Sequence, residues 1–441
     1  MAVGTGLGGQ LGTAVETPGA YGTYVVPDRF YEILTESLDR AQVVIQPNGI
    51  RAGTPNLRRG SRRTLVTNAG AGTIDFEVAT NGFGRLFKHM LGSSASTVSQ
   101  LGVTTAWRQI HQLGDNTGLY QTIQKGVPQT DGTVKPFTLL GCKLPTWEVG
   151  ISTSNYATLK LGVDAKQVVT SQTLAVASYT NSHTLSFAQA TLSVGNLAAP
   201  SAGLAVSNVG SAGAVQYNYK VASVNAQGES TPSASFNTTT GNATLTGSNY
   251  NSVAWTAVSG ATSYNVYGRP ATSGGAYFLL GSTAASPYLD QNNTAGTISP
   301  PTLNTAGVPI ASVSDATVMG SMPMKVDRYY LGATGLKAEP IQNDYPTVTG
   351  KLTADFLSQA DFYDRYAADS AAVLQLTFVG QTISAPWTEL LTISVPEVHF
   401  LGDTPNLGGL DIIQQSVNFE AAYDGTNPGA QITYVSTDTS I

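Results

Sequence analysis

The chain contains one glycine motif whose spacing could hold a cofactor. Gly4, Gly6 and Gly9 match the G-x-G-x-x-G pattern of a dinucleotide-binding loop. Such a loop must follow a strand and open a helix, because the helix N-terminus holds the pyrophosphate. Here the motif opens the sequence, and the residues after it favour a strand. We therefore expect an extended N-terminal arm and no cofactor.

Residues that could bind a metal or attack a substrate are also poorly arranged for it. The four histidines lack H-x-x-x-H or paired-cysteine spacing: His89, His111, His183 and His399. Cys142 lies in a strand-like stretch, which favours a buried structural thiol over a nucleophile. Asp75 and Glu77 share the solvent-facing side of a strand, whereas catalytic carboxylates need a cleft. No G-x-S-x-G or P-loop signature occurs, so we expect neither a metal site nor enzyme activity.

Charge is the third source of chemistry, and it is unevenly distributed. Residues 41–72 contain no acid and five arginines: Arg51, Arg58, Arg59, Arg62 and Arg63. Residues 351–441 hold eleven acidic residues, opposed only by Lys351 and Arg365. Complementary charge fixes the register of partners, and head-to-tail contacts build rings or filaments. The arginine loop is therefore predicted to be a subunit or ring-stacking interface; the alternative is a solvated surface loop.

The central structural unit is predicted in residues 72–92. Ile74, Phe76 and Val78 alternate with polar residues, as in a strand with one buried face. After a break, the next apolar residues form one stripe of a helix that packs on a sheet: Phe83, Leu86, Phe87 and Met90. Asn81 is placed to cap this helix and Gly92 to end it.

The remaining residues predict an all-β protein with a few short helices. Only 11% of the residues are charged, which is typical of β-rich, turn-rich structural proteins. A helix is expected in residues 27–38 and another after the capping-box-like Ser358–Asp361. Strands are expected at Tyr120–Lys125, Pro136–Cys142, Trp147–Ser152, Tyr156–Val163 and Thr184–Phe187, with four more between residues 372 and 436. Their spacing favours an antiparallel sandwich or barrel.

Composition changes between residues 198 and 307, where only four residues are charged. Two alternating strand pairs around Tyr219 and Trp255 predict a small β-sandwich. It resembles fibronectin type III or immunoglobulin-like modules, although the order of its motifs departs from the usual one and allows a circularly permuted variant. Residues 186–196 and 307–320 predict two strands of one hairpin, so we expect domain 198–307 to be inserted at its tip between domain parts 1–197 and 308–441.

Several motifs on both sides of this insert resemble the tail tube proteins of long-tailed bacteriophages. They are GLGGQLGTAVETPGAYGTYVVPDRFYEIL, NGFGRLFKHMLG, VKPFTLLGCKLPTWE, DRYYLG and TVTGKLTADF. The resemblance implies a β-sandwich with a flanking helix that assembles into stacked hexameric rings. It also implies that the protein is part of the virion tail and is assembled in the cytoplasm of the bacterial host. It implies a tape-measure protein inside, tail terminator and distal tail proteins at the ends, and double-stranded DNA passing without specific binding.

The net charge of −6 argues against a dedicated nucleic-acid binder and suits a lumen through which DNA slides. No signal peptide is visible and no run approaches the about 18 apolar residues of a membrane span. The inserted module is expected to decorate the tail exterior and to contact host glycans. The alternative function is a non-polymerising baseplate protein or secreted adhesin that binds carbohydrate through this module.

Overall fold

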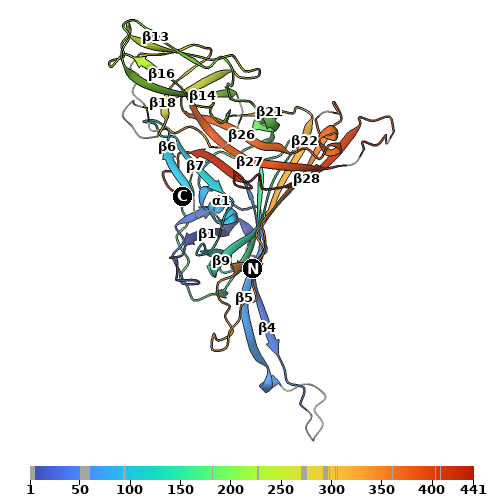
Figure 1. The fold of residues 1–441 in the computed structure, drawn as a ribbon. Coiled ribbons are helices and arrows are strands. Elements are labelled where there is room, and N and C mark those ends of the chain that lie inside the picture. The colour runs from blue at the N-terminus through green and yellow to red at the C-terminus, as the bar shows by residue number, and fades with distance from the viewer. Residues whose placement is uncertain are drawn as a thin grey trace.

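The computed structural model shows an all-β protein with two α-helices among the residues that it describes. These are residues 5–441, except for 50–59, 93–95, 181, 226–227, 270–275, 292–295, 297, 303, 305, 360, 403 and 408. A body of interlocked sheets occupies the centre, a long hairpin projects from one end, and a separate pair of sheets lies at the other end (Figure 1).

One long strand belongs to two sheets. The first half of β9 (Val134–Ser152) lies in a sheet with β1 (Gln10–Val15), β2 (Arg29–Tyr31), β8 (Gln121–Pro128) and β11 (Gln167–Val169). Its second half pairs instead with β10 (Thr158–Ala165) and β22 (Val313–Ser321). Gly141, with φ of 63°, lies at the passage between the sheets, where a left-handed conformation turns the chain. The sequence predicted two strands here, and one continuous strand is found.

The sheet containing the second half of β9 extends on both sides. Its further strands are β3 (Thr35–Glu36), β4 (Asp39–Ile45), β5 (Thr64–Glu77), β25 (Thr347–Asp355) and β28 (Gln414–Ala421). The last strand is the end of β27 (Trp387–Leu401). The first half of β27 belongs to a facing layer with β6 (Thr97–Gln100), β7 (Trp107–Gln112), β12 (Ala190–Asn196), β21 (Gly307–Pro309), β26 (Ala372–Ser384) and β29 (Gln431–Ser436).

Helix α1 (Gly84–Leu91) lies inside the body against β7 and β9. Only Lys88 of its eight residues is not buried, so the helix is enclosed rather than laid on a sheet by one stripe. It ends at Gly92, with φ of 65°, as predicted. The prediction that Asn81 caps the helix was wrong. Phe83 is the N-cap residue, and the Asn81 side chain accepts hydrogen bonds from Thr437 instead of from the helix.

Two other helix predictions need correction. Residues 27–38 are extended and contribute β2 and β3, because pairing with β1 and β5 overrides their helical spacing. A helix does follow Ser358, as α2 (Tyr363–Ala367), but Phe362 is its N-cap and no side chain caps it. At the N-terminus, Gly6–Gly8 form a short 3₁₀ turn before β1, and Gly4 lies outside the described residues.

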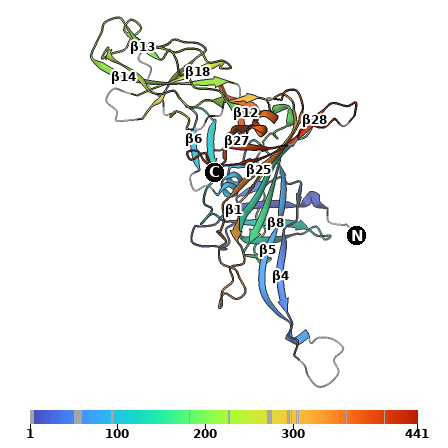
Figure 2. The same ribbon diagram turned by 45° about the vertical axis from the view of Figure 1, so that its right-hand side comes forward.

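Residues 205–290 form two facing sheets with a hydrophobic cluster of their own (Figure 2). One sheet holds β13 (Ala205–Val209), β17 (Tyr250–Ala254) and β20 (Tyr288–Asp290). The other holds β14 (Val215–Asn225), β15 (Gly228–Glu229), β16 (Phe236–Gly241), β18 (Ser263–Arg269) and β19 (Phe278–Thr283). The chain leaves the body through β12 and returns through β21, which pair with each other. The following β22 pairs with β9 and β25 instead, so the predicted hairpin is shorter than expected.

Candidate assembly surfaces

The β4–β5 hairpin is the largest projection of the body (Figure 1). Of the five predicted interface arginines, Arg62 and Arg63 are exposed at its far end beside a 3₁₀ turn (Gly60–Arg62). Arg51, Arg58 and Arg59 lie outside the described residues. Along the hairpin, Val43 and Ile45 are 53% and 56% exposed. An apolar stem with a basic end is a surface that gains stability when a partner covers it.

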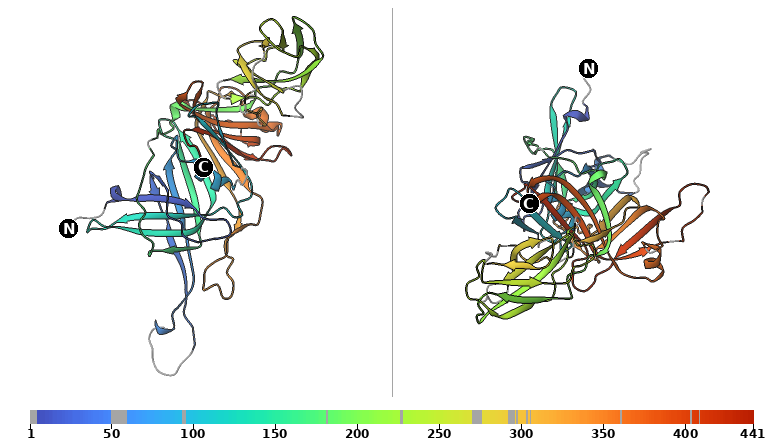
Figure 3. Two further views of the ribbon diagram at one scale, coloured as in Figure 1. Left: turned by 90° about the vertical axis from the view of Figure 1, so that its left-hand side faces the viewer. Right: turned by 90° about the horizontal axis from the view of Figure 1, so that it is seen from above.

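A second segment, residues 326–346, lies beside the hairpin and carries the small strands β23 (Met324–Lys325) and β24 (Ile341–Gln342) at its base (Figure 3). Two buried ion pairs fix it to the body, Lys337 with Asp164 at 2.5 Å and Glu339 with Lys143 at 2.6 Å. Burial raises the pKa of the Asp164 carboxyl against the effect of Lys337, and burial lowers the pKa of Lys143. Because separating either pair would leave a buried charge without its partner, the two pairs hold the segment against the body.

The acidic residues of the last 91 positions do not gather into one patch. Glu389 is buried and accepts from His183, and Asp438 is tied to Arg29. The segments around α2 and after β27 carry further acids together with large exposed apolar residues. The acids are Asp355, Asp361, Asp364, Asp369 and Asp411, and the apolar residues are Leu357, Leu407, Leu410 and Ile412. We call this set the acidic surface. The strands next to it, β27 and β28, lie at the opposite end of the body from the end of the β4–β5 hairpin (Figure 1).

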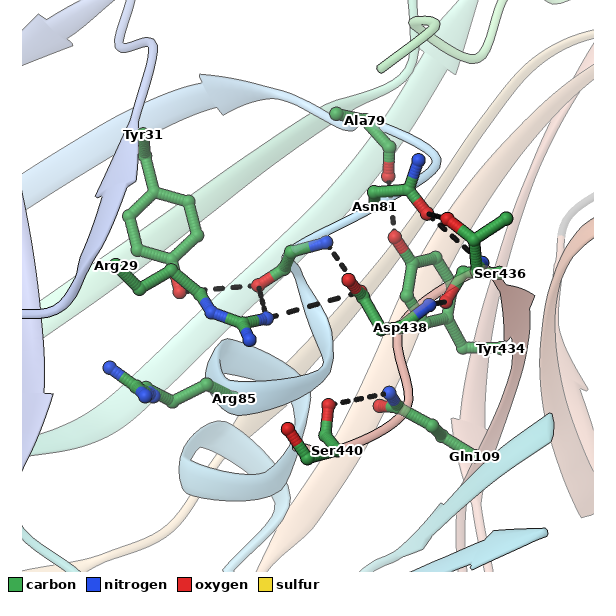
Figure 4. Close-up of polar contacts among 12 residues, drawn as sticks. Arg29, Tyr31, Ala79, Asn81, Arg85, Gln109, Tyr434, Ser436, Asp438 and Ser440 are labelled. Carbon is green, nitrogen blue, oxygen red and sulfur yellow. Dashed lines mark hydrogen bonds and ion pairs between the residues drawn. The ribbon is translucent and has the colours of Figure 1, made fainter. Parts of the chain in front are cut away.

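The helix residues predicted to pack on a sheet are all in the core: Phe83, Leu86, Phe87 and Met90 are at most 3% exposed. Figure 4 shows how the turn before them is held. The Gly82 amide donates to Asp438 at 2.6 Å, and the Gly82 carbonyl accepts from Arg29 and Tyr31. The side chain of Asn81 accepts from Thr437 instead of capping the helix.

Arg85, in the first turn of this helix, binds the N-terminal segment of the chain. Its guanidinium is buried, donates to both carboxylate oxygens of Asp28 and also donates to the carbonyl of Thr13. Burial raises the pKa of Asp28, but the hydrogen bonds and charge of Arg85 outweigh it, so the pKa lies below its usual value. The N-terminal and C-terminal segments therefore both bind the strand–turn–helix unit. Sequence reasoning missed these residues, because each lies far along the chain from its partner.

The groups that might have done chemistry are structural. Cys142 is fully buried, and burial raises its pKa well above the ordinary value, so it is a poor nucleophile. Burial lowers the pKa of His89 and of His111 to about 3, which keeps both rings neutral. Within the described residues, no three histidine, cysteine or acidic side chains are grouped to hold a metal ion.

The module formed by residues 205–290 has a closed core. Tyr219 is buried and donates to Asp290, and Tyr264 is buried against Trp255. These tyrosines are therefore unavailable to a ligand. The module also contacts the body, where the Asn225 side chain donates to the carbonyl of Gly307. Burial lowers the pKa of Arg108 in β7 below its usual value, and the nearby Tyr267 and Glu229 of the module only partly oppose this shift.

One comparison with known proteins identifies a family. A family model described as "Phage tail tube protein" matches residues 6–277 and 253–421, which together span most of the chain. No curated protein matches the chain. None of the helices in the described residues is long and apolar enough to cross a membrane.

Proposed function

The chain belongs to the phage tail tube protein family and is a structural component of the virion tail. We propose that it self-assembles into stacked hexameric rings. These rings form the conduit through which the genome is delivered. The tape-measure protein fills the lumen during assembly, the tail terminator and distal tail proteins bind the two ends, and double-stranded DNA passes without specific binding. The alternative of a non-polymerising adhesin has no observation in its favour beyond the presence of a sandwich module.

The observation that carries the stacking proposal is the placement of unlike surfaces at opposite ends. The β4–β5 hairpin, with Arg62 and Arg63, projects from one end of the body, and β27 and β28, next to the acidic surface, lie at the other (Figure 1). A heterologous contact between two such surfaces propagates along an axis, because each bound copy presents a fresh basic tip. Complementary charge orients the encounter and fixes its register. The arginine loop thus bridges successive rings.

The module (residues 198–307) is proposed as an inserted immunoglobulin-like or fibronectin type III-like domain on the outside of the tube. Its own core and its attachment through the adjacent β12 and β21 support this, because a domain inserted there leaves the body's other pairings intact. Contact with host glycans would use exposed residues, since its buried tyrosines are committed to the core.

The stacking proposal is tested by reversing charge at the hairpin tip. Arg62→Glu with Arg63→Glu places acids opposite the acidic surface, so the critical concentration for tube formation should rise by about tenfold or more. Electron microscopy and sedimentation of the full-length protein measure this. The matched control is Lys135→Glu, an exposed lysine in β9. Normal tubes from the double variant would refute the role given to this loop.

A second test removes the module. Replacing residues 198–307 by a short linker should leave tubes of normal length that lack outer knobs in electron micrographs. A soluble variant that folds but never assembles would show that the module belongs to the tube wall.

A further inference from the structure

The strands of the body pair in the same pattern twice. In residues 10–169 the neighbours are β2–β1, β1–β8, β8–β9, β9–β11, β9–β10, β10–β5 and β5 with β3 and β4. In residues 190–436 they are β21–β12, β12–β26, β26–β27, β27–β29, β27–β28, β28–β25 and β25–β22. Every pair is antiparallel, and the matching strands follow one another in the same chain order. We call these the first and second repeats.

The helices and insertions obey the same correspondence. Helix α1 follows β5 and contacts β9, and α2 follows β25 and contacts β27. The module lies between β12 and β21, where the first repeat has only a loop between β1 and β2. The β4–β5 projection corresponds to the segment between β22 and β25 that holds β23 and β24. A duplicated tube unit accounts for all of these matches.

The two repeats differ in how their long strands end. The second half of β9 is paired on both edges, with β10 on one side and with β22 of the second repeat on the other. The corresponding part of β27, His399–Leu401, pairs with β28 alone among the described residues. The strands that correspond to β22 are β3 and β4, and within the described residues they pair only with β5. Each chain thus contains one complete junction between repeats, formed by β9 and β22. It also contains the two strand edges that a second such junction would need, one at β27 and one at β3 and β4.

At the edge of β3 and β4 that faces away from β5, charged side chains hydrogen bond to the backbone, as is common on unpaired strand edges. The amide of Leu38 donates to the Glu36 carboxylate, and its carbonyl accepts from the Lys125 ammonium. Lys125 and Glu36 also form an ion pair at 2.9 Å. Charged side chains over backbone groups are a common way to keep an open edge from pairing indiscriminately.

Resting on the proposed ring function, we propose that β3 and the start of β4 of one copy add to the open edge of β27 in the next copy. The contact repeats between chains the β22–β9 junction found within the chain. It is a strand addition, in which main-chain hydrogen bonds supply affinity and alternate side chains supply register. Because each chain supplies two repeats, the sixfold unit of the hexameric ring proposed above is the tube unit, and three chains supply its six tube units.

The register of this junction follows from the internal one. Trp147 and Phe400 are the buried aromatic residues in the second halves of the two long strands. Trp147 pairs with Leu161, which pairs with Ile74, which pairs with Glu36. In the second repeat, the same path joins Phe400, Phe419, Gly350 and Val318. Ser37 therefore corresponds to Met319, and Leu401 to Glu148, a residue directly opposite Met319. The proposed junction therefore places Ser37 of one copy opposite Leu401 of the next copy.

Engineered cysteines test that placement in assembled full-length protein. Ser37→Cys with Leu401→Cys changes two exposed positions, and oxidation should convert most chains into covalent multimers. The matched control, Met319→Cys with Glu148→Cys, has the same register inside one chain and should form a bond without changing the chain's mass. Cys142 is buried and does not compete. If the control closes and rings form, yet the interchain pair stays reduced, the junction is wrong.

The number of chains is tested by native mass spectrometry of single rings and by the symmetry of tube cross-sections in cryo-electron microscopy. Three chains of 45.8 kDa, about 137 kDa in all, support the inference. A ring of six chains would overturn it while leaving the tube function intact. A protein that remains monomeric at every concentration would refute the proposed function and this junction together.

Discussion

Helices α1 and α2 occupy matching places in the two repeats, but their surroundings differ. Seven of the eight residues of α1 are buried, and both ends of the chain are hydrogen bonded around it. None of the five residues of α2 is buried, and the strand beside it has an open edge. The helix of the first repeat is therefore enclosed by its own chain, whereas the helix of the second repeat is not. We therefore expect α1 to contribute more to the stability of the fold than α2 does.

The strongest test of this comparison is truncation of a core aromatic in each repeat. Phe87→Ala empties a fully buried site in α1 and should cost about 3–5 kcal/mol of unfolding free energy. Phe362→Ala, beside α2, removes a buried ring that contacts Phe400, but the helix that follows has no buried residue and can relax around the site, so the cost should be smaller. Urea unfolding of the unassembled protein measures both. Equal losses would contradict the division of roles.

A smaller difference is expected for the arginines of the two helices. Arg85→Ala removes the charged hydrogen bonds to Asp28 and Thr13, at a cost of about 2 kcal/mol. Arg365→Ala should cost less than about 1 kcal/mol, because Arg365 lies in the partly exposed α2 and forms no ion pair with any described residue. The same urea titration serves for both variants. If the Arg365 variant lost more stability, α2 would be a stabilising element rather than a peripheral one.

The smallest expected effect concerns pH, and its sign is opposite in the two repeats. The lowered pKa of Asp28 stabilises the fold above the unfolded value near 3.8, and this contribution is lost as pH falls through the folded value. His399, next to the open edge, has a pKa raised by its hydrogen bond to Asp369. Its contribution is present below 6.5 and is lost as pH rises through the folded value.

Two variants separate these pH effects. Asp28→Asn should flatten the acid side of the stability profile, and His399→Gln should flatten the side near neutral pH. Thermal unfolding midpoints measured across the pH range provide the comparison. A His399→Gln profile that matched the unmodified protein between pH 6 and 8 would show that this contact contributes nothing.

Local patterns predicted much of the fold, because many strands have one buried and one wet face. Ile74, Phe76 and Val78 alternate as a half-buried strand should, and all three are buried. The stripe of α1 was also visible in the sequence, although nothing in it showed that Arg85 and His89 would be enclosed as well. Long-range contacts explain the errors. Phe30 and Leu38 have helical spacing, but both become buried in extended segments that pair with other strands.

The candidate surfaces were only partly predictable. The arginine loop could be found from charge, since five arginines without an acid are conspicuous in a chain with few charges. The reciprocal pairs of Lys337 with Asp164 and Lys143 with Glu339 join residues about 170 to 200 positions apart, so no local pattern reveals them. The duplication was hidden for a similar reason: the module interrupts the second repeat, and the matching strands share a pairing pattern rather than similar residues.

The junction between β9 and β22 has a consequence for the kinetics of assembly. Because both strands belong to one polypeptide, that contact forms during folding at the high effective concentration of an intramolecular reaction. In a ring of six tube units made from three such chains, only two bimolecular steps gather the chains, and the last junction closes within the complex. Half of the wall is then in place before any two molecules meet, and the entropic cost of gathering free subunits is correspondingly smaller.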